Sequence, residues 1–507
     1  MNNFVPLRLC ERKTEPVVTG QSRCIGTDYH KLIFAMKNPF RFLRLPAIFA
    51  LGLLALGSHA ETVRNVVVIT TDDQGPQAGC YGDPHAVTPN LDALAAAGTL
   101  FERGYTTQAS CSPARASLLT GLYPHQNGQV GLAGHHPEFR VKPGLPNLPA
   151  LFQEAGFATG ILGKLHVSPA RDFPFDFEWA SHGNPKLTRD VREVAARAGE
   201  FLDGTDGRRF FLYVNYFDPH RPFDDGMRQT EGLPEDPYAA AEVPPLPYLG
   251  IDGPGARAEA AAYYNGIKRM DVGLGLLFAA LKERGFWKDT LIVFVGDHGP
   301  PFTRGKTTVY EAGEQIPYIV RWPGVGDAGQ RSDALVSMVD IFPTVLDATG
   351  LAVTPNAGRS LRPVLDGALP ADWRTFLFTE YTAHAADHFY PRRAVRTERF
   401  KLIHNLDHQR PNPVPYIGAT RRAPPNRTNP DFVPAYKRME RPPEFEFFDL
   451  HQDPYELSNV ADDPTYAEPL AELKEALHAW RVATGDPLLE PAELERLREA
   501  VVREEDR

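Results

Sequence analysis

Residues 65–73 read NVVVITTDD, a continuous run of mostly β-branched apolar residues that ends in two aspartates. Such a run is typical of a strand buried on both faces, as in a parallel sheet. Three later segments have the same form, because an apolar run ends in polar, reactive side chains. They are residues 158–166, which end in Gly163-Lys164-Leu165-His166, residues 210–220, which end in Asp218-Pro219-His220, and residues 290–299, which end in Asp297-His298-Gly299.

Helical patterns alternate with these strands up to about residue 350, at residues 90–97, 114–119, 148–155 and 256–284. This alternation predicts an α/β fold in which helices flank a sheet. Ligands of such sheets bind at the carboxyl ends of the strands. We therefore expect the polar residues at the four strand ends to share one site.

The pattern changes around residues 350–375, after which we expect a smaller C-terminal α+β subdomain. Its predicted elements are short strands at 375–379 and 400–404 and a helix at 468–483. The Pro-rich segment 410–443 has no helical period, so it is predicted to be a long ordered loop or a flap. We place a catalytic domain at 61–370 and the subdomain at 371–507.

The N-terminal residues have the pattern of a secretory signal peptide. Residues 37–46 are basic, residues 47–57 are apolar, and Ser58-His59-Ala60 is a small-residue cleavage site. A signal peptide that starts at Met36 would make the protein secreted or periplasmic, and residues 1–35 would be an upstream extension from an over-extended start. A short membrane anchor or a disordered tail is the alternative. No later stretch reaches about 18 apolar residues, so we expect no membrane attachment of the mature form.

The composition limits the class of protein. The chain has 507 residues, of which 42% are hydrophobic and 23% charged, which indicates a globular protein and excludes a disordered, collagen-like or coiled-coil chain. The formal net charge of −10 is unfavourable for a general nucleic-acid-binding protein. Four cysteines are too few for a disulfide framework.

Three aspartates at the strand ends predict a cation site. Asp72, Asp73 and Asp297 would repel one another at one sheet edge and would partly protonate without a counter-charge. A hard divalent cation removes this repulsion, and oxygen ligands favour Ca²⁺ or Mg²⁺. His298 follows the third aspartate directly and would be a less usual ligand for calcium.

Cationic side chains are expected beside this metal. Lys164 alone would usually be a surface residue, and only its position at a strand end indicates a site. Together with Arg115 and Lys306 it would place positive charge next to the cation. Such a site is suited to an anionic group such as sulfate or phosphate.

Residues 110–121 read SCSPARASLLTG. Pro113 and the pattern after it fit the start of a helix, so Cys111 would lie near the positive end of a helix dipole. Cys111-x-Pro113-x-Arg115 followed by Leu-Thr-Gly resembles the signature of type I sulfatases. In that family the cysteine is oxidised after synthesis to Cα-formylglycine, and the resemblance implies the same for Cys111.

The aldehyde explains how such an enzyme can both attack sulfur and release sulfate. Its hydrate is a geminal diol, of which one hydroxyl, activated by the metal, attacks sulfur and displaces the leaving group. Deprotonation of the second hydroxyl then breaks down the sulfated hemiacetal and expels sulfate. A serine or an unmodified cysteine lacks the second hydroxyl and would stay sulfated.

Further blocks are similar to the heparan N-sulfatase (sulfamidase) branch of the family, and the likeness covers nearly all of residues 62–490. They include HQNG (125–128), GILGKLHVSP (160–169), PFDF (174–177), FFLYVNYFDPHRP (210–222) and YPRRAVRTERFKLIHNL (390–406). The resemblance implies an alkaline phosphatase-like fold with a mixed sheet and a sulfated saccharide substrate. It also implies a formylglycine-generating or anaerobic maturation enzyme as a partner, and members of the branch are often homodimers.

The same resemblance implies the metal ligands. Asp72, Asp73, Asp297 and His298 would hold one Ca²⁺, and Cys111 as formylglycine would be a further ligand. Ca²⁺ and the formylglycine are therefore the expected cofactors.

The resemblance also implies roles for the residues around the metal. Arg115 would orient the formylglycine, and Lys164 and Lys306 would bind sulfate oxygens. His166 would assist the breakdown of the hemiacetal. His220 would protonate the leaving atom, which is nitrogen in a sulfamate and oxygen in an ester.

Two positions depart from the sulfamidase pattern. Sulfamidases typically have Asn where this chain has His298, and Arg where it has Lys306. Both residues are commoner in O-sulfatases, so an O-sulfatase acting on another sulfated glycan or an aryl sulfate is the alternative to N-sulfoglucosamine hydrolysis. In either case His384 and Arg393, in the C-terminal subdomain, would contact the sugar.

Two more distant alternatives belong to other functional classes. A phosphodiesterase or phosphomutase of the same superfamily would have Thr or Ser in place of Cys111 and would usually need two metals. A glycan-binding protein without activity would have lost part of the metal or sulfate set. Every expected position is filled in this chain, which disfavours the second alternative.

Overall fold

The computed structural model describes residues 63–223, 233–367, 369–417 and 429–505. The predicted signal peptide and upstream extension lie outside these ranges, as do residues 418–428 of the Pro-rich segment. Among the described residues, no helix is both long enough and apolar enough to span a bilayer.

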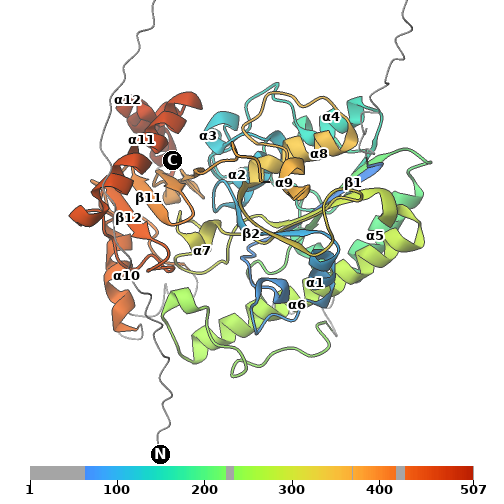
Figure 1. The fold of residues 1–507 in the computed structure, drawn as a ribbon, viewed down its shortest axis with the longest axis horizontal. Coiled ribbons are helices and arrows are strands. Elements are labelled where there is room, and N and C mark those ends of the chain that lie inside the picture. The colour runs from blue at the N-terminus through green and yellow to red at the C-terminus, as the bar shows by residue number, and fades with distance from the viewer. Residues whose placement is uncertain (1–62, 224–232, 368, 418–428, 506–507) are drawn as a thin grey trace, which may run out of the picture. The chain divides into compact units, whose positions relative to one another are not determined.

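A large mixed sheet forms the main body (Figure 1). Its strands lie in the order β4-β3-β5-β1-β6-β7-β2-β8. The strands are β1 (Asn65–Thr71), β2 (Thr99–Tyr105), β3 (Ala158–Gly163), β4 (Phe177–Trp179), β5 (Phe210–Tyr216), β6 (Thr290–Gly296), β7 (Tyr318–Arg321) and β8 (Gln330–Ser337). β7 is antiparallel to both of its neighbours, and the other pairs are parallel. The expected α/β fold is confirmed.

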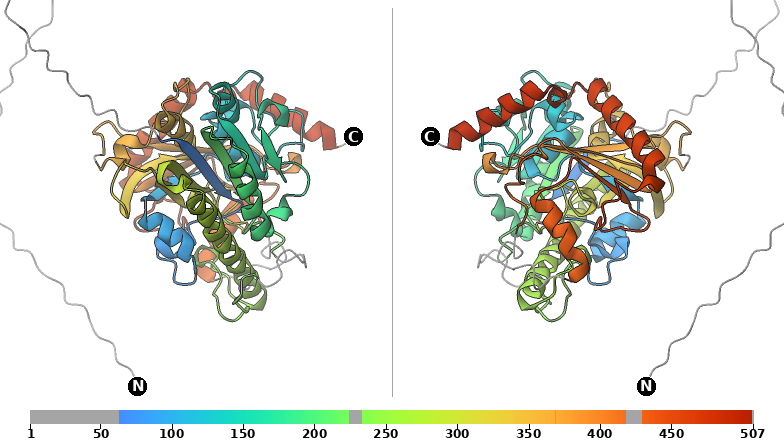
Figure 2. Two further views of the ribbon diagram at one scale, coloured as in Figure 1. Left: turned by 90° about the vertical axis from the view of Figure 1, so that its right-hand side faces the viewer. Right: turned by 90° about the vertical axis from the view of Figure 1, so that its left-hand side faces the viewer.

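Helices cover both faces of this sheet (Figures 1 and 2). One face is covered by α2 (Cys111–Thr120), α4 (Leu148–Glu154) and α8 (Ile341–Thr349), and the other by α1 (Pro89–Ala96), α5 (Val191–Asp203) and α6 (Pro254–Glu283). The short helices are α3 (Pro124–Asn127), α7 (Glu311–Glu314) and α9 (Arg362–Leu365). Because side chains alternate along a strand, β1 places Val66 and Val68 in one core and Val67 and Ile69 in the other. This burial on both faces explains the continuous apolar run.

The apolar runs themselves predict strands at 65–70, 158–162, 210–216 and 290–295. These are β1, β3, β5 and β6, and the observed ends differ by at most one residue. The sequence pattern did not indicate β4 and β8, which are the two edges of the sheet, nor the interior strands β2 and β7. The first half of β8 alternates between half-buried and exposed residues, so it lacks the continuous apolar run of a central strand. Helix α2 begins at Cys111, three residues before its predicted start.

A second, antiparallel sheet has the strand order β12-β11-β10-β9. Its strands are β9 (Leu377–Tyr381), β10 (Arg392–Arg396), β11 (Phe400–Asn405) and β12 (Phe445–Asp449), and the helices around it are α10 (Val433–Glu440), α11 (Ala467–Ala483) and α12 (Pro491–Glu505). This is the smaller C-terminal α+β subdomain that the sequence predicted. Its boundary at residue 370 stays a prediction.

The prediction of a loop for residues 410–443 is wrong near its end, where α10 lies. Pro434 occupies the first turn of this helix, where a missing N–H removes no intrahelical hydrogen bond. Ala435, Tyr436 and Met439 are then buried on one side. Two turns are too few to show a clear helical period in the sequence.

Trp480 of α11 packs the subdomain against the main body. Its indole stacks on Phe378 of β9 with ring centroids 4.9 Å apart. It also makes edge contacts with Tyr123 and His125, whose centroids lie 5.0 and 5.2 Å away. The Trp480 side chain therefore holds two parts of the fold that are far apart in the sequence.

We expect Trp480→Ala to lower the free energy of unfolding by about 3–5 kcal/mol, because it removes a buried ring and leaves a cavity. Val482 lies on the same helix and is 57% exposed. Val482→Ala is therefore the control, and it should change the free energy by less than about 0.5 kcal/mol. Chemical denaturation followed by circular dichroism measures both variants. A loss below about 1 kcal/mol for Trp480→Ala would contradict this role of the indole.

Candidate active site

The four expected strand ends meet at one edge of the large sheet. β3, β5, β1 and β6 are neighbours in that order and run parallel, so their carboxyl ends lie side by side. Asp72 and Asp73 follow β1, Lys164 follows β3, His220 follows β5 and Asp297 follows β6. Residues from distant parts of the chain are brought together by this strand order.

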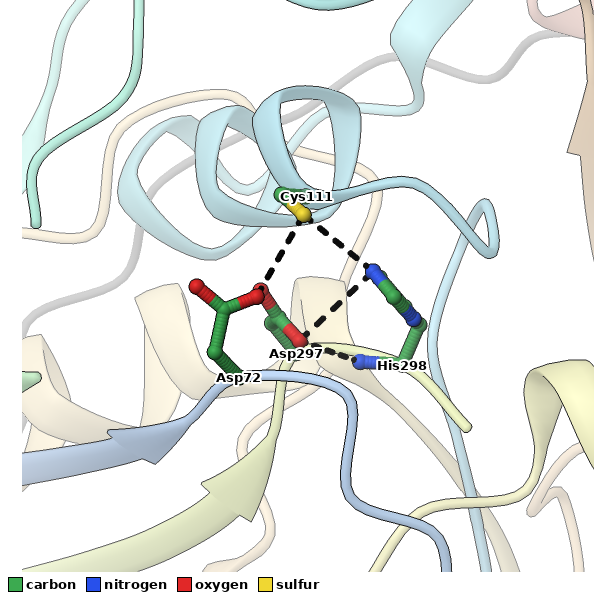
Figure 3. Close-up of side chains that lie close together, drawn as sticks. All are labelled: Asp72, Cys111, Asp297 and His298. Carbon is green, nitrogen blue, oxygen red and sulfur yellow. Dashed lines mark hydrogen bonds and ion pairs between the residues drawn. The ribbon is translucent and has the colours of Figure 1, made fainter. Parts of the chain in front are cut away.

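Helix α2 brings Cys111 to the same edge (Figure 3). Its Sγ lies 3.4 Å from Oδ1 of Asp72, 3.4 Å from Nε2 of His298 and 3.5 Å from Nζ of Lys306. Asp72, Cys111, Asp297 and His298 offer possible metal-binding atoms that all lie within 4.8 Å of one another. All four side chains are buried.

Three cationic side chains neutralise the three aspartates. Nζ of Lys164 lies 2.6 Å from Oδ2 of Asp72, Nζ of Lys306 lies 2.7 Å from Oδ1 of Asp73, and Nη2 of Arg115 lies 3.0 Å from Oδ2 of Asp297. The aspartates are fully buried, so each charge needs such a partner. The site thus combines carboxylates that can hold a cation with cations that can hold an anion.

Comparison with known proteins agrees with this geometry. Residues 64–351 match the sulfatase family, and residues 296–411 match the C-terminal domain of N-sulphoglucosamine sulphohydrolase. The chain belongs to the sulfatase family. It is 36% identical over 482 residues to N-sulphoglucosamine sulphohydrolase from Homo sapiens, a match that covers 87% of this chain and 94% of that protein. It is 25% identical to N-acetylglucosamine-6-O-sulfatase from Bacteroides thetaiotaomicron, over 87% of this chain and 90% of that protein.

Solved structures share the fold of this sulfatase. A putative sulfatase from Bacteroides thetaiotaomicron has a TM-score of 0.66 at 21% identity and covers 84% of this chain and 93% of its own. A protein in complex with its substrate D-glucosamine-2-N,6-O-disulfate has a TM-score of 0.63 at 21% identity, over 84% and 99%. The alkaline phosphatase-like architecture implied by the sequence is confirmed, and the protein is a hydrolase of the sulfatase family.

Arg115 of the sulfatase is fixed by several partners besides Asp297. Its Nη1 donates to Oδ1 of Asn215 at 2.6 Å and to the carbonyl of Lys164 at 3.0 Å. Asn215 lies within β5 and was not among the residues expected at the site. The available signal was an amide inside the apolar strand FFLYVNY, because a polar side chain buried in a strand needs a hydrogen-bond partner.

The two aspartates nearest Cys111 have opposite pKa shifts. Burial and the neighbouring Asp72 carboxylate raise the pKa of Asp297 to about 6. Burial and Cys111 also raise the pKa of Asp72. The positive charges of Lys164, His220 and Arg115 outweigh this effect and hold that pKa below the usual range. Two buried carboxylates this close do not ionise independently, and Asp297 is the one that keeps its proton up to about pH 6.

The surroundings of Cys111 favour negative charge. Burial raises the pKa of the Cys111 thiol, but Lys164, Lys306 and His298 outweigh it and lower that pKa well below its usual value. Burial also opposes the charged form of His298, yet Asp297 and Cys111 raise the pKa of this imidazole to about 9. An anion at position 111 is therefore stabilised from several directions.

Two further histidines border the site. Burial and Lys164 lower the pKa of His166 to about 4, so its imidazole is neutral at neutral pH. The Nδ1 atom of His220 is hydrogen-bonded to the carbonyl of Arg221, and its Nε2 lies 3.3 Å from Nζ of Lys306. Because a carbonyl only accepts, Nδ1 of His220 carries the hydrogen, and Nε2 is the atom that faces the site.

Of the two residues expected to contact the sugar, one borders the site and the other does not. Nδ1 of His384 lies 2.9 Å from Oγ of Ser110, the residue before the reactive cysteine, so His384 borders the site. Arg393 is only 1% exposed, and its Nε lies 2.9 Å from Asp486 and 3.3 Å from Glu380. The expectation for Arg393 is therefore wrong, because both carboxylates occupy its guanidinium inside the subdomain.

Proposed function

We propose that this sulfatase removes the N-sulfate from terminal glucosamine of heparan or heparin fragments, using one Ca²⁺ and Cys111 oxidised to formylglycine. The observation that carries the proposal is the position of Cys111, at the start of α2 inside a buried set of carboxylates and cations. The choice of N-sulfoglucosamine is supported by the similarity to the human N-sulphoglucosamine sulphohydrolase, which extends over both sheets.

The donor set fits a hard cation. Three carboxylates converge, and Oδ2 of Asp73 is buried without a hydrogen-bond partner among the described residues. Asp72, Asp73 and Asp297 would hold Ca²⁺ through oxygen atoms, and His298 and the oxidised Cys111 would complete the set. Bound Ca²⁺ would lower the pKa of a formylglycine hydroxyl and offset the charge of the sulfate.

Oxidation of Cys111 would supply the nucleophile. The hydrated aldehyde offers two hydroxyls, of which one takes the sulfuryl group and the other, once deprotonated, releases it as sulfate. His166 is neutral above about pH 4 and interacts with the side chain of Cys111, so it can accept the second proton. A formylglycine-generating or anaerobic maturation enzyme is the partner that this modification requires.

The remaining residues bind the substrate and assist departure of the leaving group. Lys164 and Lys306 both lie near residue 111, where their charges lower the pKa of the thiol, and bind sulfate oxygens. Arg115 orients residue 111 through its ion pair with Asp297. His220 presents Nε2 to the site and, as an imidazolium with hydrogens on both ring nitrogens, gives the Nε2 proton to the leaving nitrogen or oxygen. His384 contacts the sugar.

The extracellular location and the assembly of the protein are also proposals. A signal peptide that starts at Met36 would direct it to the periplasm or outside the cell, where sulfated glycans occur. A homodimer is the assembly implied by the sulfamidase resemblance.

An O-sulfatase is the second candidate. His298 and Lys306 are the residues that favour it, because sulfamidases typically have Asn and Arg at these positions. Relatives that share part of the chain include an N-acetylgalactosamine-6-sulfatase from Rattus norvegicus, at 31% identity over 61% of this chain. The name of that enzyme indicates a sulfate ester, not a sulfamate, as its substrate.

Sulfate release from N-sulfoglucosamine and from glucosamine 6-sulfate under equal conditions distinguishes the two candidates. We expect kcat/KM for N-sulfoglucosamine to exceed that for the ester by about 10²-fold or more. A site whose polar groups bind the sulfamate leaves those groups unpaired when the sulfate is attached elsewhere on the sugar. N-acetylglucosamine 6-sulfate is the control for the effect of the free amine. Activity on the esters alone would reject the first candidate.

A further inference from the structure

A buried arginine lies beneath the loop that carries His220. The loop comprises residues 217–222 and follows β5, and the arginine is Arg189, the last residue of the 3₁₀ helix η3 (Pro185–Arg189). Its side chain is 0% exposed. No step of the proposed reaction uses it.

Arg189 binds this loop at three points. Its Nε donates to Oδ1 of Asp218 at 3.0 Å, and its Nη2 donates to the carbonyl of His220 at 2.7 Å and to that of Pro222. These two carbonyls lie on either side of Arg221, whose own carbonyl accepts the hydrogen of Nδ1 of His220. One guanidinium thus fixes the backbone that in turn fixes the imidazole.

Asp218 is held from a second direction as well. Arg269 of α6 donates from Nε to Oδ2 at 2.6 Å and from Nη2 to Oδ1 at 2.7 Å. The carbonyl of Asp218 also accepts from the N–H of Asp72 at 3.4 Å, which ties the loop to a proposed metal ligand. Because Arg269 keeps the carboxylate paired, loss of Arg189 leaves no uncompensated buried charge at Asp218.

We propose that Arg189 is a positioning residue that sets the place of His220 relative to the leaving atom. The inference rests on the proposed role of His220 as proton donor. A donor must lie within hydrogen-bond reach of the atom that it protonates, so a displacement of about 1 Å removes much of its contribution. Lysine cannot replace the arginine fully, because an ammonium group lacks the planar fork that reaches a carboxylate and two carbonyls at once.

A proton donor matters in proportion to the basicity of the leaving group. An amine or alkoxide needs a proton to depart, whereas a nitrophenolate departs as an anion. Displacement of His220 should therefore slow the hydrolysis of N-sulfoglucosamine and spare that of 4-nitrophenyl sulfate. A general loss of folding would slow both reactions, so the ratio of the two rates separates positioning from stability.

The test compares kcat and KM of three variants on these two substrates. The control is Arg438→Met, because Arg438 of α10 binds in the same way, to the carboxylate of Glu446 and to the carbonyls of Leu457 and Glu456. Arg189→Met should lower kcat for N-sulfoglucosamine by about 10²-fold with KM changed by less than about 3-fold, and His220→Ala should lower it by at least as much. Both should keep kcat/KM for 4-nitrophenyl sulfate within about 3-fold of the wild type, and Arg438→Met should leave the ratio of the two substrates unchanged.

The outcomes distinguish the inference from the proposed function. An equal loss on both substrates for His220→Ala would overturn the role of His220 and with it the basis for Arg189. A substrate-dependent loss for His220→Ala without one for Arg189→Met would overturn the positioning role alone. If Arg189→Met does not fold, Arg189→Lys takes its place, with Arg438→Lys as its control.

Hydrogen exchange measures the same constraint without turnover. The N–H of His220 is bonded to the carbonyl of Phe217 at 2.9 Å, so exchange at this amide reports on the order of the loop. In Arg189→Met, peptides that cover residues 217–222 should exchange about tenfold faster, while peptides from β6 keep the wild-type rate. Unchanged protection of the loop would also overturn the inference.

Discussion

Cys111→Ala is expected to lower sulfate release from N-sulfoglucosamine by about 10⁴-fold or more, because it removes the group that takes the sulfuryl moiety. The substitution should lower the rate of the reaction and leave the stability of the fold unchanged. Cys111 is the first residue of α2 and its sulfur faces the site, so alanine keeps the helix start and should leave the melting temperature within a few degrees of the wild type. Rate assays and calorimetry on the same preparation measure both.

Cys80→Ala is the matched control, since Cys80 is the other cysteine within the described residues and its backbone is bonded to Asp92 of α1 and Arg331 of β8. It should keep the wild-type rate. Mass spectrometry of the peptide that contains Cys111 should show the thiol replaced by an aldehyde, with sulfur and two hydrogens lost and one oxygen gained. A fully active enzyme with an unmodified thiol, or more than about a tenth of the activity in Cys111→Ala, would exclude formylglycine as the nucleophile.

The second large effect concerns calcium and pH. With Cys111 unmodified, the pKa of Asp297 is raised to about 6 by burial and by Asp72, so this carboxyl is protonated in a range where an ordinary aspartate is ionised. Ca²⁺ must displace that proton. We expect its affinity to fall as the pH drops below about 6, by about tenfold per pH unit for one proton, whereas an unperturbed aspartate would cause this loss only near pH 4.

Calorimetric titration with Ca²⁺ at several pH values, in buffers of different ionisation enthalpy, measures the affinity and the number of protons released. His298, whose pKa is raised to about 9, must also lose a proton to act as a ligand, so it should add a dependence of about tenfold per pH unit below pH 9, and Asp297 should steepen it below about pH 6. Asp297→Asn should bind Ca²⁺ at least about 10²-fold more weakly and should lose the change near pH 6. An affinity that does not change between about pH 5 and pH 7 would contradict the assignment of Asp297 as a ligand.

Local pattern was sufficient to predict four of the six interior strands of the large sheet. β1, β3, β5 and β6 are buried on both faces, so each has a continuous apolar run that is visible in the sequence. The edge strands β4 and β8 have no such run, β2 is interrupted by Glu102 and Arg103, and β7 has only four residues. The short helix α10 shows no clear period. These elements are stabilised by the parts of the fold on which they pack, and that support is not encoded in their own residues.

The position of the site could also be predicted, because polar residues at the carboxyl ends of parallel strands share one edge. The expected set around Cys111 is brought together there. Asn215 and Arg189 were not singled out, although each contacts a residue of that set. Arg393 was expected at the substrate and is instead paired with Asp486, a residue 93 positions further along the chain.

The sequence alone therefore predicts the reactive groups of the site. These are the cysteine in its signature, the three aspartates and the cations that accompany them. These depend on residue type and on the ends of buried strands, and both are local properties. Which buried charges pair with one another, and which loop is held by which guanidinium, follows from folding alone. Such pairs join segments that are far apart in sequence, and a hydrogen bond forms only when packing brings its two atoms within about 3 Å in the correct orientation.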